Sequence, residues 1–330
     1  MKRLLIVAAF LALLPLLRNA YLVNLLVIIA LFSLPALGLS LLMGYTGQIS
    51  LGHAALIGVG AYASAVISAR AGLDPWIAVV LSTVLSAFVA WSIGWLVFRL
   101  RGHYLAMATL AFGIIVHVAM VEWRGVTGGQ DGLSGVAPLA FGAFELSSDY
   151  RMYPVAWVAC LMGVVLANNL VRSPAGLAMR VVAENEAVAG SVGIASDRLK
   201  RQIMAISGAY AGLGGALYAH WLGYISPGPF DVGFSIRLLL MVALGGFAGI
   251  WSVLFGVAFV VVTSELLKPL GRFDVVVYGV LLVVVMIWFP KGLLPGLGDL
   301  LQRLRGPRRA PLQREPSVQT DAPVSAERLA

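Results

Sequence analysis

A cluster of hydrogen-bonding residues and glycines lies between two long apolar stretches in the first part of the chain. It contains Gly44, Tyr45, Thr46, Gly47, Gln48, Ser50, Gly52 and His53. The side chains could offer donors and acceptors to a polar or zwitterionic solute, and the glycines can adopt positive φ angles or approach another backbone closely. Irregular backbone within a bilayer persists only against other protein or a water-filled cavity, because lipid cannot pair its N–H and C=O groups. We therefore predict that residues 44–53 line or gate a solute path; a structural turn between helices is the alternative.

A second segment, residues 173–201, is polar and rich in small side chains. Ser173 and Pro174 fit the N-cap and first position of a helix. A short helix is expected from Asn185 to Ile194, with Asn185 as its cap and Gly193 as its stop. Such a helix could seat deeply in a groove of a partner protein, and a solvated connector is the alternative. The residues expected to contact the partner are Glu184, Asn185, Glu186, Ala187, Gly190 and Gly193.

The elements that position both segments are membrane helices. The chain is 60% hydrophobic and 12% charged, with a mean hydropathy of +0.92, whereas soluble domains carry about 25% charged residues. We predict an all-α polytopic membrane protein with about ten transmembrane or re-entrant helices. The apolar runs cover residues 4–17, 20–43, 54–69, 75–98, 104–121, 154–171, 202–222, 235–248, 250–267 and 275–289.

The number of crossings follows from the distribution of basic residues, which collect on the cytoplasmic side of short loops. Clusters at residues 2–3, 99–101, 172–201 and 291–309 all fall inside with about ten crossings. That count needs a hairpin within the uncharged stretch 238–264, where Gly245, Gly246 and Gly249 could form the turn. Both termini are then cytoplasmic, whereas nine crossings would put the C-terminus outside. The first run could instead be a signal peptide, although no small-x-small cleavage site follows it directly.

Small residues recur at helical spacing within Ala54–Ser68 and again within Ser207–Ala219. Such stripes let helix backbones approach closely in lipid. Because each half would contain about five crossings, the two halves would have opposite orientations, and the stripes also raise the possibility of an inverted repeat, with simple helix packing as the alternative. The single cysteine, Cys160, excludes a disulfide within the chain and is expected in the core.

Catalysis is not expected, because no nucleophile–base arrangement, metal-ligand spacing or phosphate-binding Gly-x-x-x-x-Gly-Lys-Ser/Thr loop is present. The glycine-rich segment Gly128–Gly132 should be an external turn or a contact for a binding protein. The net charge of +8 is explained largely by cytoplasmic loops and the tail, so no nucleic-acid role is expected. Ionisable residues at or near the ends of apolar runs could touch solute or reach the membrane interface: His117, Glu122, His220, Arg237 and Glu265.

In order and spacing, several landmarks of residues 20–298 resemble the permease subunits of branched-chain amino acid ABC importers, of the LivM type. The landmarks are Gly44–His53, Gly58–Tyr62, Arg101–Phe112, Thr127–Leu133, Glu184–Glu186, Ile225–Pro227 and Pro290–Leu294. The resemblance implies that residues 1–298 form a permease domain. Residues 299–330 are proline- and arginine-rich and are expected to be a disordered basic cytoplasmic tail near anionic lipid.

The resemblance also implies partners. A periplasmic solute-binding protein would deliver the solute, a sister permease, whether a paralogue or an identical chain, would enclose the path, and two ATP-binding cassette subunits would bind ATP, so the chain itself needs no cofactor. Glu184–Ile194 resembles the loop that docks on the ATPases, although Val188 interrupts the usual glutamate-alanine-alanine pattern. Import of branched-chain amino acids across the inner membrane is the expected function. Urea or short amides are alternative solutes, and a secondary transporter, a channel or a membrane-embedded enzyme are alternative classes.

Overall fold

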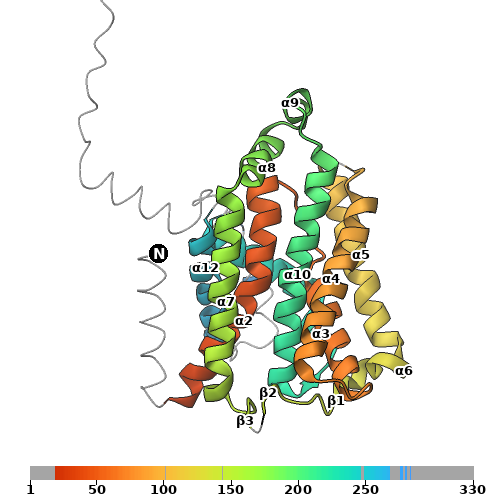
Figure 1. Cartoon of the computed structure of the whole chain (residues 1–330), viewed down its shortest axis with the longest axis vertical. Coiled ribbons are helices and arrows are strands. Elements are labelled where there is room, and N and C mark those ends of the chain that lie inside the picture. Colours follow the sequence, from red (N-terminus) through yellow and green to blue (C-terminus); the bar gives the residue numbers. More distant parts are fainter. Residues whose placement is uncertain are drawn as a thin grey trace, which may run out of the picture.

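The computed structural model describes residues 19–100, 102–142, 144–246 and 249–267, together with positions 276, 277, 279, 280 and 283. This part of the chain is helical apart from two short strand pairs, which agrees with the predicted all-α class. Most of the long helices run along the long axis of the molecule (Figure 1). They are α2 (Ala20–Ser40), α3 (His53–Ala69), α4 (Pro75–Val97), α5 (His103–Glu122), α7 (Asp149–Arg172), α10 (Ser196–Leu222), α11 (Val232–Gly245) and α12 (Ile250–Leu267).

Five helices are long and apolar enough to cross a membrane, counted over the described residues only. They are α2 with its π-helical extension η2 (Leu41–Tyr45), α4, α5, α7 and α12. The helices α3 and α11 are apolar but shorter. α10 is longer than any of them but rich in glycine and alanine, and its middle is buried. The predicted apolar run at 4–17, most of the run at 275–289 and the predicted tail at 299–330 lie outside the described residues.

The centre of the bundle is formed by α3, α4 and α10, which pack directly against one another. The packing depends on the two small-residue stripes. A Cβ atom on Gly60 would collide with the backbone of Gly212, and one on Gly215 would collide with the carbonyl oxygen of Ile57. Close backbone approach of this kind is how helices associate in lipid, so the expectation of helix packing by these stripes is confirmed.

Side chains at the helix starts define where the helices begin. Asn19 accepts hydrogen bonds from the backbone N–H groups of Tyr21 and Leu22 at the start of α2. Asp74 accepts one from Trp76, with Pro75 at the first position of α4. In both cases a polar side chain satisfies backbone donors that have no partner within the helix.

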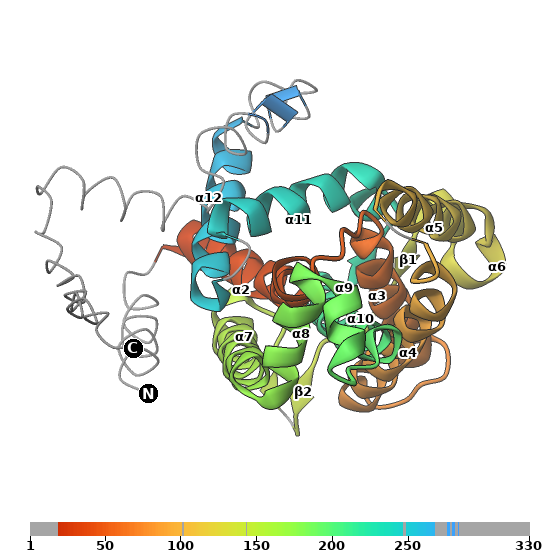
Figure 2. The same cartoon turned by 90° about the horizontal axis from the view of Figure 1, so that it is seen from above.

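The stretch 238–264 is broken into two helices, as predicted. α11 ends at Gly245, Gly246 has φ +91°, and α12 begins at Ile250. Viewed from above, α11 is seen side-on along one side of the bundle, between α12 and α5, whereas α7 is seen closer to end-on (Figure 2). The axis of α11 is therefore strongly inclined to that of α7.

The two ends of the bundle differ. At one end, α8 (Pro174–Glu184) and α9 (Glu186–Ser191) project beyond the long helices (Figure 1). At the opposite end lie α6 (Arg124–Thr127), η3 (Gly129–Asp131), η4 (Gly228–Phe230) and four two-residue strands. The strand β1 (Leu133–Ser134) pairs antiparallel with β4 (Tyr224–Ile225), and β2 (Ala140–Phe141) pairs with β3 (Phe144–Glu145).

Candidate functional site

Residues 46–52 form an irregular segment between η2 and α3, at the end of α2 that lies near α8. The hydroxyl of Thr46 donates to the carbonyl oxygen of Leu42 over 2.5 Å, and the backbone N–H of Gln48 donates to the same oxygen over 3.2 Å. Gly47 has φ +68°, a conformation that costs a residue with a Cβ atom about 1–2 kcal/mol. The positive φ angle expected for one of the glycines is thus confirmed at Gly47.

The backbone at Gly52 lies close to the backbone of another helix, which is the second property predicted for the glycines. Its φ is −103°, but a Cβ atom there would collide with the carbonyl oxygen of Thr109 in α5. The Thr109 hydroxyl in turn accepts a hydrogen bond from the backbone N–H of Leu51 over 3.1 Å. Irregular backbone at residues 51–52 is therefore satisfied by another helix, as membrane burial requires.

His53 is fully buried at the start of α3 and both of its ring nitrogens are hydrogen-bonded. Nδ1 lies 3.0 Å from the hydroxyl of Ser50, and Nε2 lies 2.6 Å from the hydroxyl of Ser207 in α10. One residue further on, the backbone N–H of Ala54 donates to the hydroxyl of Ser235 in α11 over 3.1 Å. Side chains from α10 and α11 thus hold the first turn of α3.

Burial divides the predicted path residues into two groups. Tyr45, Thr46, Ser50, Gly52 and His53 are buried within the chain, and the Gln48 side-chain amide donates to the Thr46 carbonyl oxygen over 2.9 Å. Gly47 and Ile49 are exposed, and Gly44 and Gln48 are partly exposed. Ser50 and His53 therefore brace the segment internally, while residues 47–49 form the surface that can meet a solute or another subunit.

The segment between α7 and α10 forms helices close to those predicted, with one correction. α8 begins at Pro174 after Ser173, but the Ser173 hydroxyl donates to the Leu170 carbonyl oxygen over 2.7 Å and makes no cap hydrogen bond. Asn185 does cap α9, since its side-chain oxygen accepts from the backbone N–H groups of Ala187 and Val188. α9 ends at Ser191, before Gly193 with φ +82°, and is thus shorter than predicted.

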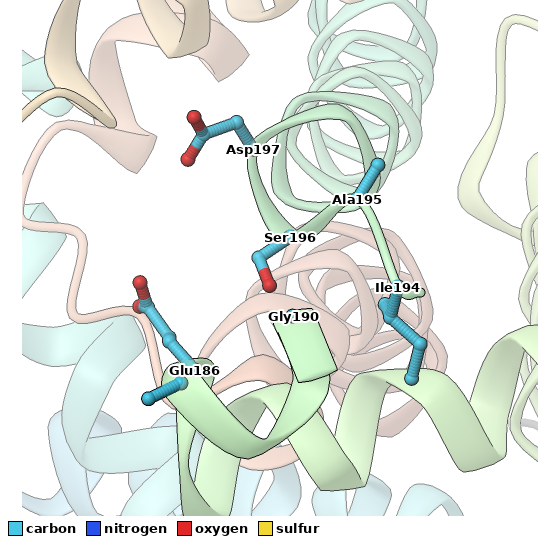
Figure 3. A pocket seen from close by; sticks show the side chains of 7 residues that line it. Glu186, Gly190, Ile194, Ala195, Ser196 and Asp197 are labelled. Atoms are coloured by element: carbon cyan, nitrogen blue, oxygen red, sulfur yellow. The ribbon is translucent and has the colours of Figure 1, made fainter. Parts of the chain in front are cut away.

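α9 is tied to the start of α10 by an ion pair between Glu186 and Lys200. The Lys200 side chain is 2% exposed, which is unusual for lysine. Beside this pair lies a cavity of about 380 Å³ between α9 and α10, lined by Glu186, Ala187, Gly190, Ile194, Ala195, Ser196 and Asp197. The carboxylates of Glu186 and Asp197 point to the same open side of this cavity, and Ile194 lies at its other side (Figure 3).

The structure brings the two predicted segments into contact. A Cβ atom built on Gly47 would lie 3.5 Å from Cα and Cβ of Ala183 in α8, which is ordinary van der Waals contact. The Arg180 guanidinium lies over the Tyr45 ring, 5.7 Å from its centroid, within the range of a cation–π interaction. Sequence reasoning treated the segments separately and missed Arg180 and Ala183, because neither residue is unusual in its local sequence.

A known protein family matches most of the chain. Residues 21–287 match the family model described as the branched-chain amino acid transport system permease component. The chain belongs to this permease family. With its apolar helices, it is a multi-pass membrane protein. No solved structure is similar enough to the chain to count as a match.

Curated relatives of this permease include the high-affinity branched-chain amino acid transport system permease proteins LivM of Salmonella typhimurium and of Escherichia coli K12. Each is 32% identical over 283 residues, which are 78% of this chain and 66% of the relative, slightly under two thirds of its length. The LivH protein of Salmonella typhimurium is 25% identical over 282 residues, covering 80% of this chain and 91% of the relative. The permease is thus related to both LivM and LivH proteins.

At the opposite end of the permease, Gly128–Gly132 forms a turn. Gly128, Gly129 and Gly132 have positive φ angles, and a Cβ atom on Gly132 would collide with the carbonyl oxygen of Ile225. His220 is buried nearby, with Nε2 2.8 Å from the hydroxyl of Ser64 and Nδ1 2.7 Å from the carbonyl oxygen of Ala137. The glycine segment and His220 therefore join the outer loops to α3 and α10.

The other ionisable candidates do not gather into one site. Glu122 is exposed at the end of α5, and Arg237 lies over the Phe234 ring at 5.5 Å from its centroid. His117 and Glu265 are partly buried on α5 and α12. Within the described ranges, no three His, Cys, Asp or Glu side chains are grouped so that they could hold a metal ion.

Proposed function

We propose that this chain is a permease subunit of an ABC importer that carries branched-chain amino acids, or related solutes, across the bacterial inner membrane. The observation that carries the proposal is that α8 lies against the end of η2 and the irregular segment 46–52, at Arg180–Tyr45 and at Ala183–Gly47. A partner ATPase bound to α8 and α9 could act through these contacts on residues 47–49. The chain has no phosphate-binding loop of its own, so ATP is bound by two ATP-binding cassette subunits and the chain needs no cofactor.

The remaining partners follow from the same proposal. A related permease completes the solute path, and a periplasmic binding protein delivers the solute to the end that carries α6 and the short strands. Relatedness to both LivM and LivH proteins favours a paralogous pair over two identical chains. Branched-chain amino acids are the default solute because relatives carry that description, and urea or short amides are the alternative for the same family of permeases.

The orientation is part of the proposal: the α8–α9 end is cytoplasmic and the chain has about ten crossings with both termini inside. Arg172, Arg180, Arg198 and Arg201 at the α8–α9 end support it. An impermeant thiol reagent applied to intact cells tests it in a Cys160→Ser background. Ser147→Cys should be labelled and Val192→Cys should not, since both positions are exposed at opposite ends. The reverse pattern would overturn the orientation.

An inverted repeat is also proposed. In each half, a long helix leads into an irregular segment and then a short helix: α2, residues 46–52 and α3 in the first, and α10, residues 223–231 and α11 in the second. Gly44-Tyr45 ends η2 in the first half, and Gly223-Tyr224 directly follows α10 in the second. Inverted repeats with broken helices are common where transporters bind their solutes.

The function is tested by reconstituting the chain with its co-encoded permease, ATPases and binding protein in proteoliposomes. Uptake of labelled leucine should require ATP and the binding protein, and Ala187→Trp or Gly190→Trp in α9 should abolish assembly or separate ATP hydrolysis from uptake. Ala187 and Gly190 are exposed, so neither tryptophan should disturb the fold of the chain itself. Uptake driven without the ATPases would refute the ABC assignment, and uptake of urea but not leucine would refute the solute.

A further inference from the structure

A groove of about 500 Å³ lies between α3, α4 and α5, within the size range of about 300–1,000 Å³ that is typical of ligand pockets. Its walls are almost entirely apolar. Side chains spaced by four residues on α3 form its floor, and α4 and α5 form its sides. The lining includes Val59, Ala63, Ile67, Val89, Val116 and Ala119.

The groove opens toward the lipid-facing side of the bundle. Leu85 of α4 and Ile115 of α5 both line it and are 43% and 67% exposed. In a membrane, exposed apolar side chains of this kind are surrounded by acyl chains. A groove that water cannot fill favourably and that opens to lipid is suited to a hydrocarbon chain, because an empty groove forfeits the dispersion contacts of its walls.

The end of the groove near α6 has the character of a membrane interface. Trp123, Val126 and Thr127 close it, and Trp123 is 62% exposed, as is common for tryptophan at headgroup depth. Arg70 lies one turn beyond Ile67 and donates to the carbonyl oxygen of Gly125. Arg124 adjoins Trp123, and both arginines are exposed.

The arginines at this rim are suited to a lipid headgroup. Arg70 and Arg124 place two exposed guanidinium groups there, and guanidinium groups bind phosphate through paired hydrogen bonds. We propose that the groove between α3, α4 and α5 binds one acyl chain of an anionic phospholipid, with the phosphate at Arg70 and Arg124. The lipid comes from the leaflet at the α6 end.

Photolabelling tests the proposal on the full chain without any transport measurement. The chain is reconstituted in phosphatidylethanolamine nanodiscs with a trace of phosphatidylglycerol that carries a diazirine on its acyl chain, and labelled peptides are mapped by mass spectrometry. Labelling should concentrate on the groove residues of α4 and α5, several-fold above the exposed position Val80 of α4. Ala63→Phe should fill the groove and remove most of that labelling. The matched control Val80→Phe, at a position that is 61% exposed, should leave it unchanged.

Further experiments test which molecule occupies the groove and which lipid headgroup it prefers. Ala119→Phe fills the groove from α5 and replaces Ala63→Phe if that variant fails to fold. A phosphatidylcholine probe should label the groove several-fold less than phosphatidylglycerol, and the double variant Arg70→Gln/Arg124→Gln should abolish this preference. Uniform labelling of α4 and α5 that neither filling variant alters would overturn the site. Equal labelling by both headgroups would overturn the anionic ligand.

Discussion

The Nε2 atom of His53 in α3 lies 2.6 Å from the hydroxyl oxygen of Ser207 in α10, and the reverse pairing occurs near the far ends of the same helices. There, the hydroxyl of Ser64 in α3 lies 2.8 Å from Nε2 of His220 in α10. Between the two pairs, Gly60 and Gly212 allow backbone contact. α3 and α10 are therefore joined by a histidine–serine pair on each side of a glycine contact, which fixes both their register and their separation.

The first prediction concerns the His53–Ser207 pair. Ser207→Ala should lower the thermal stability of the purified chain, because a ring nitrogen of His53 would lose its partner while it stays buried. Interhelical hydrogen bonds in membranes contribute about 0.6–1.7 kcal/mol, so a double-mutant cycle with His53→Phe should give a coupling energy in that range. Ser92→Ala is the control, because Ser92 is only partly buried on α4 and its hydroxyl donates to the Phe88 carbonyl oxygen of its own helix. Equal destabilisation by Ser92→Ala and Ser207→Ala would contradict this account.

The second prediction concerns the glycine contact. Gly60→Val should prevent folding or strongly reduce the yield from membranes, because its Cβ atom would overlap the Gly212 backbone and neither helix can move without breaking the histidine–serine pairs. Gly228→Ala is the control, since a Cβ atom at Gly228 meets nothing within 4 Å. Yield and monodispersity in detergent are the measurements. A Gly60→Val protein with the yield of Gly228→Ala would show that α3 and α10 are further apart.

The helices that were predicted well are those identified by a continuous apolar run in their own sequence. α4 and α5 match the apolar runs at 75–98 and 104–121 within a residue at each end, because a lipid-facing helix must be apolar along its length. The interruption after residue 43 was also predictable, since glycines and polar side chains are adjacent in sequence. The roles of Ser207, Ser235, Thr109 and Ala183 were not, because each is defined by a contact between distant segments and an isolated serine or alanine in a helix gives no signal of its partner.

The third prediction separates two residues that the sequence analysis grouped together. Gln48 is partly exposed, whereas Ser50 is buried and bonded to His53. Gln48→Leu should therefore reduce uptake by the reconstituted complex with little change in yield, if residues 47–49 meet the solute. Ser50→Ala should instead lower stability, because His53 Nδ1 would lose its partner. Uptake at the normal rate by Gln48→Leu would exclude the exposed part of the segment from the solute path.

The fourth prediction tests whether Gly47 needs its conformation and its contact with α8. Gly47→Ala should be strained at φ +68°, by about 1–2 kcal/mol, and Gly47→Val should also press on Ala183. Both variants should impair uptake, the valine variant more. Gly72→Ala is the matched control, because Gly72 has φ +64° but meets nothing within 4 Å. Equal loss of uptake in Gly47→Ala and Gly72→Ala would mean that backbone strain alone, and not contact with α8, accounts for the effect.

The last prediction concerns the ion pair that holds α9 to α10. Glu186→Ala would leave the Lys200 ammonium buried without its partner, which should lower stability by more than the roughly 1–3 kcal/mol that an unpaired neutral group costs. Adding Lys200→Met should recover part of that loss, since apolar residues can replace a buried ion pair at little cost. Uptake should not recover with it, because α9 is no longer fixed to α10 and movement of a docked ATPase would not reach α10. Arg198→Gln removes an exposed positive charge from the same turn and should change neither quantity. Full uptake by the stable double variant would show that α9 is not needed to transmit movement of the ATPase to the permease. The contacts of Ala183 and Arg180 in α8 would then couple the ATPase to the solute path.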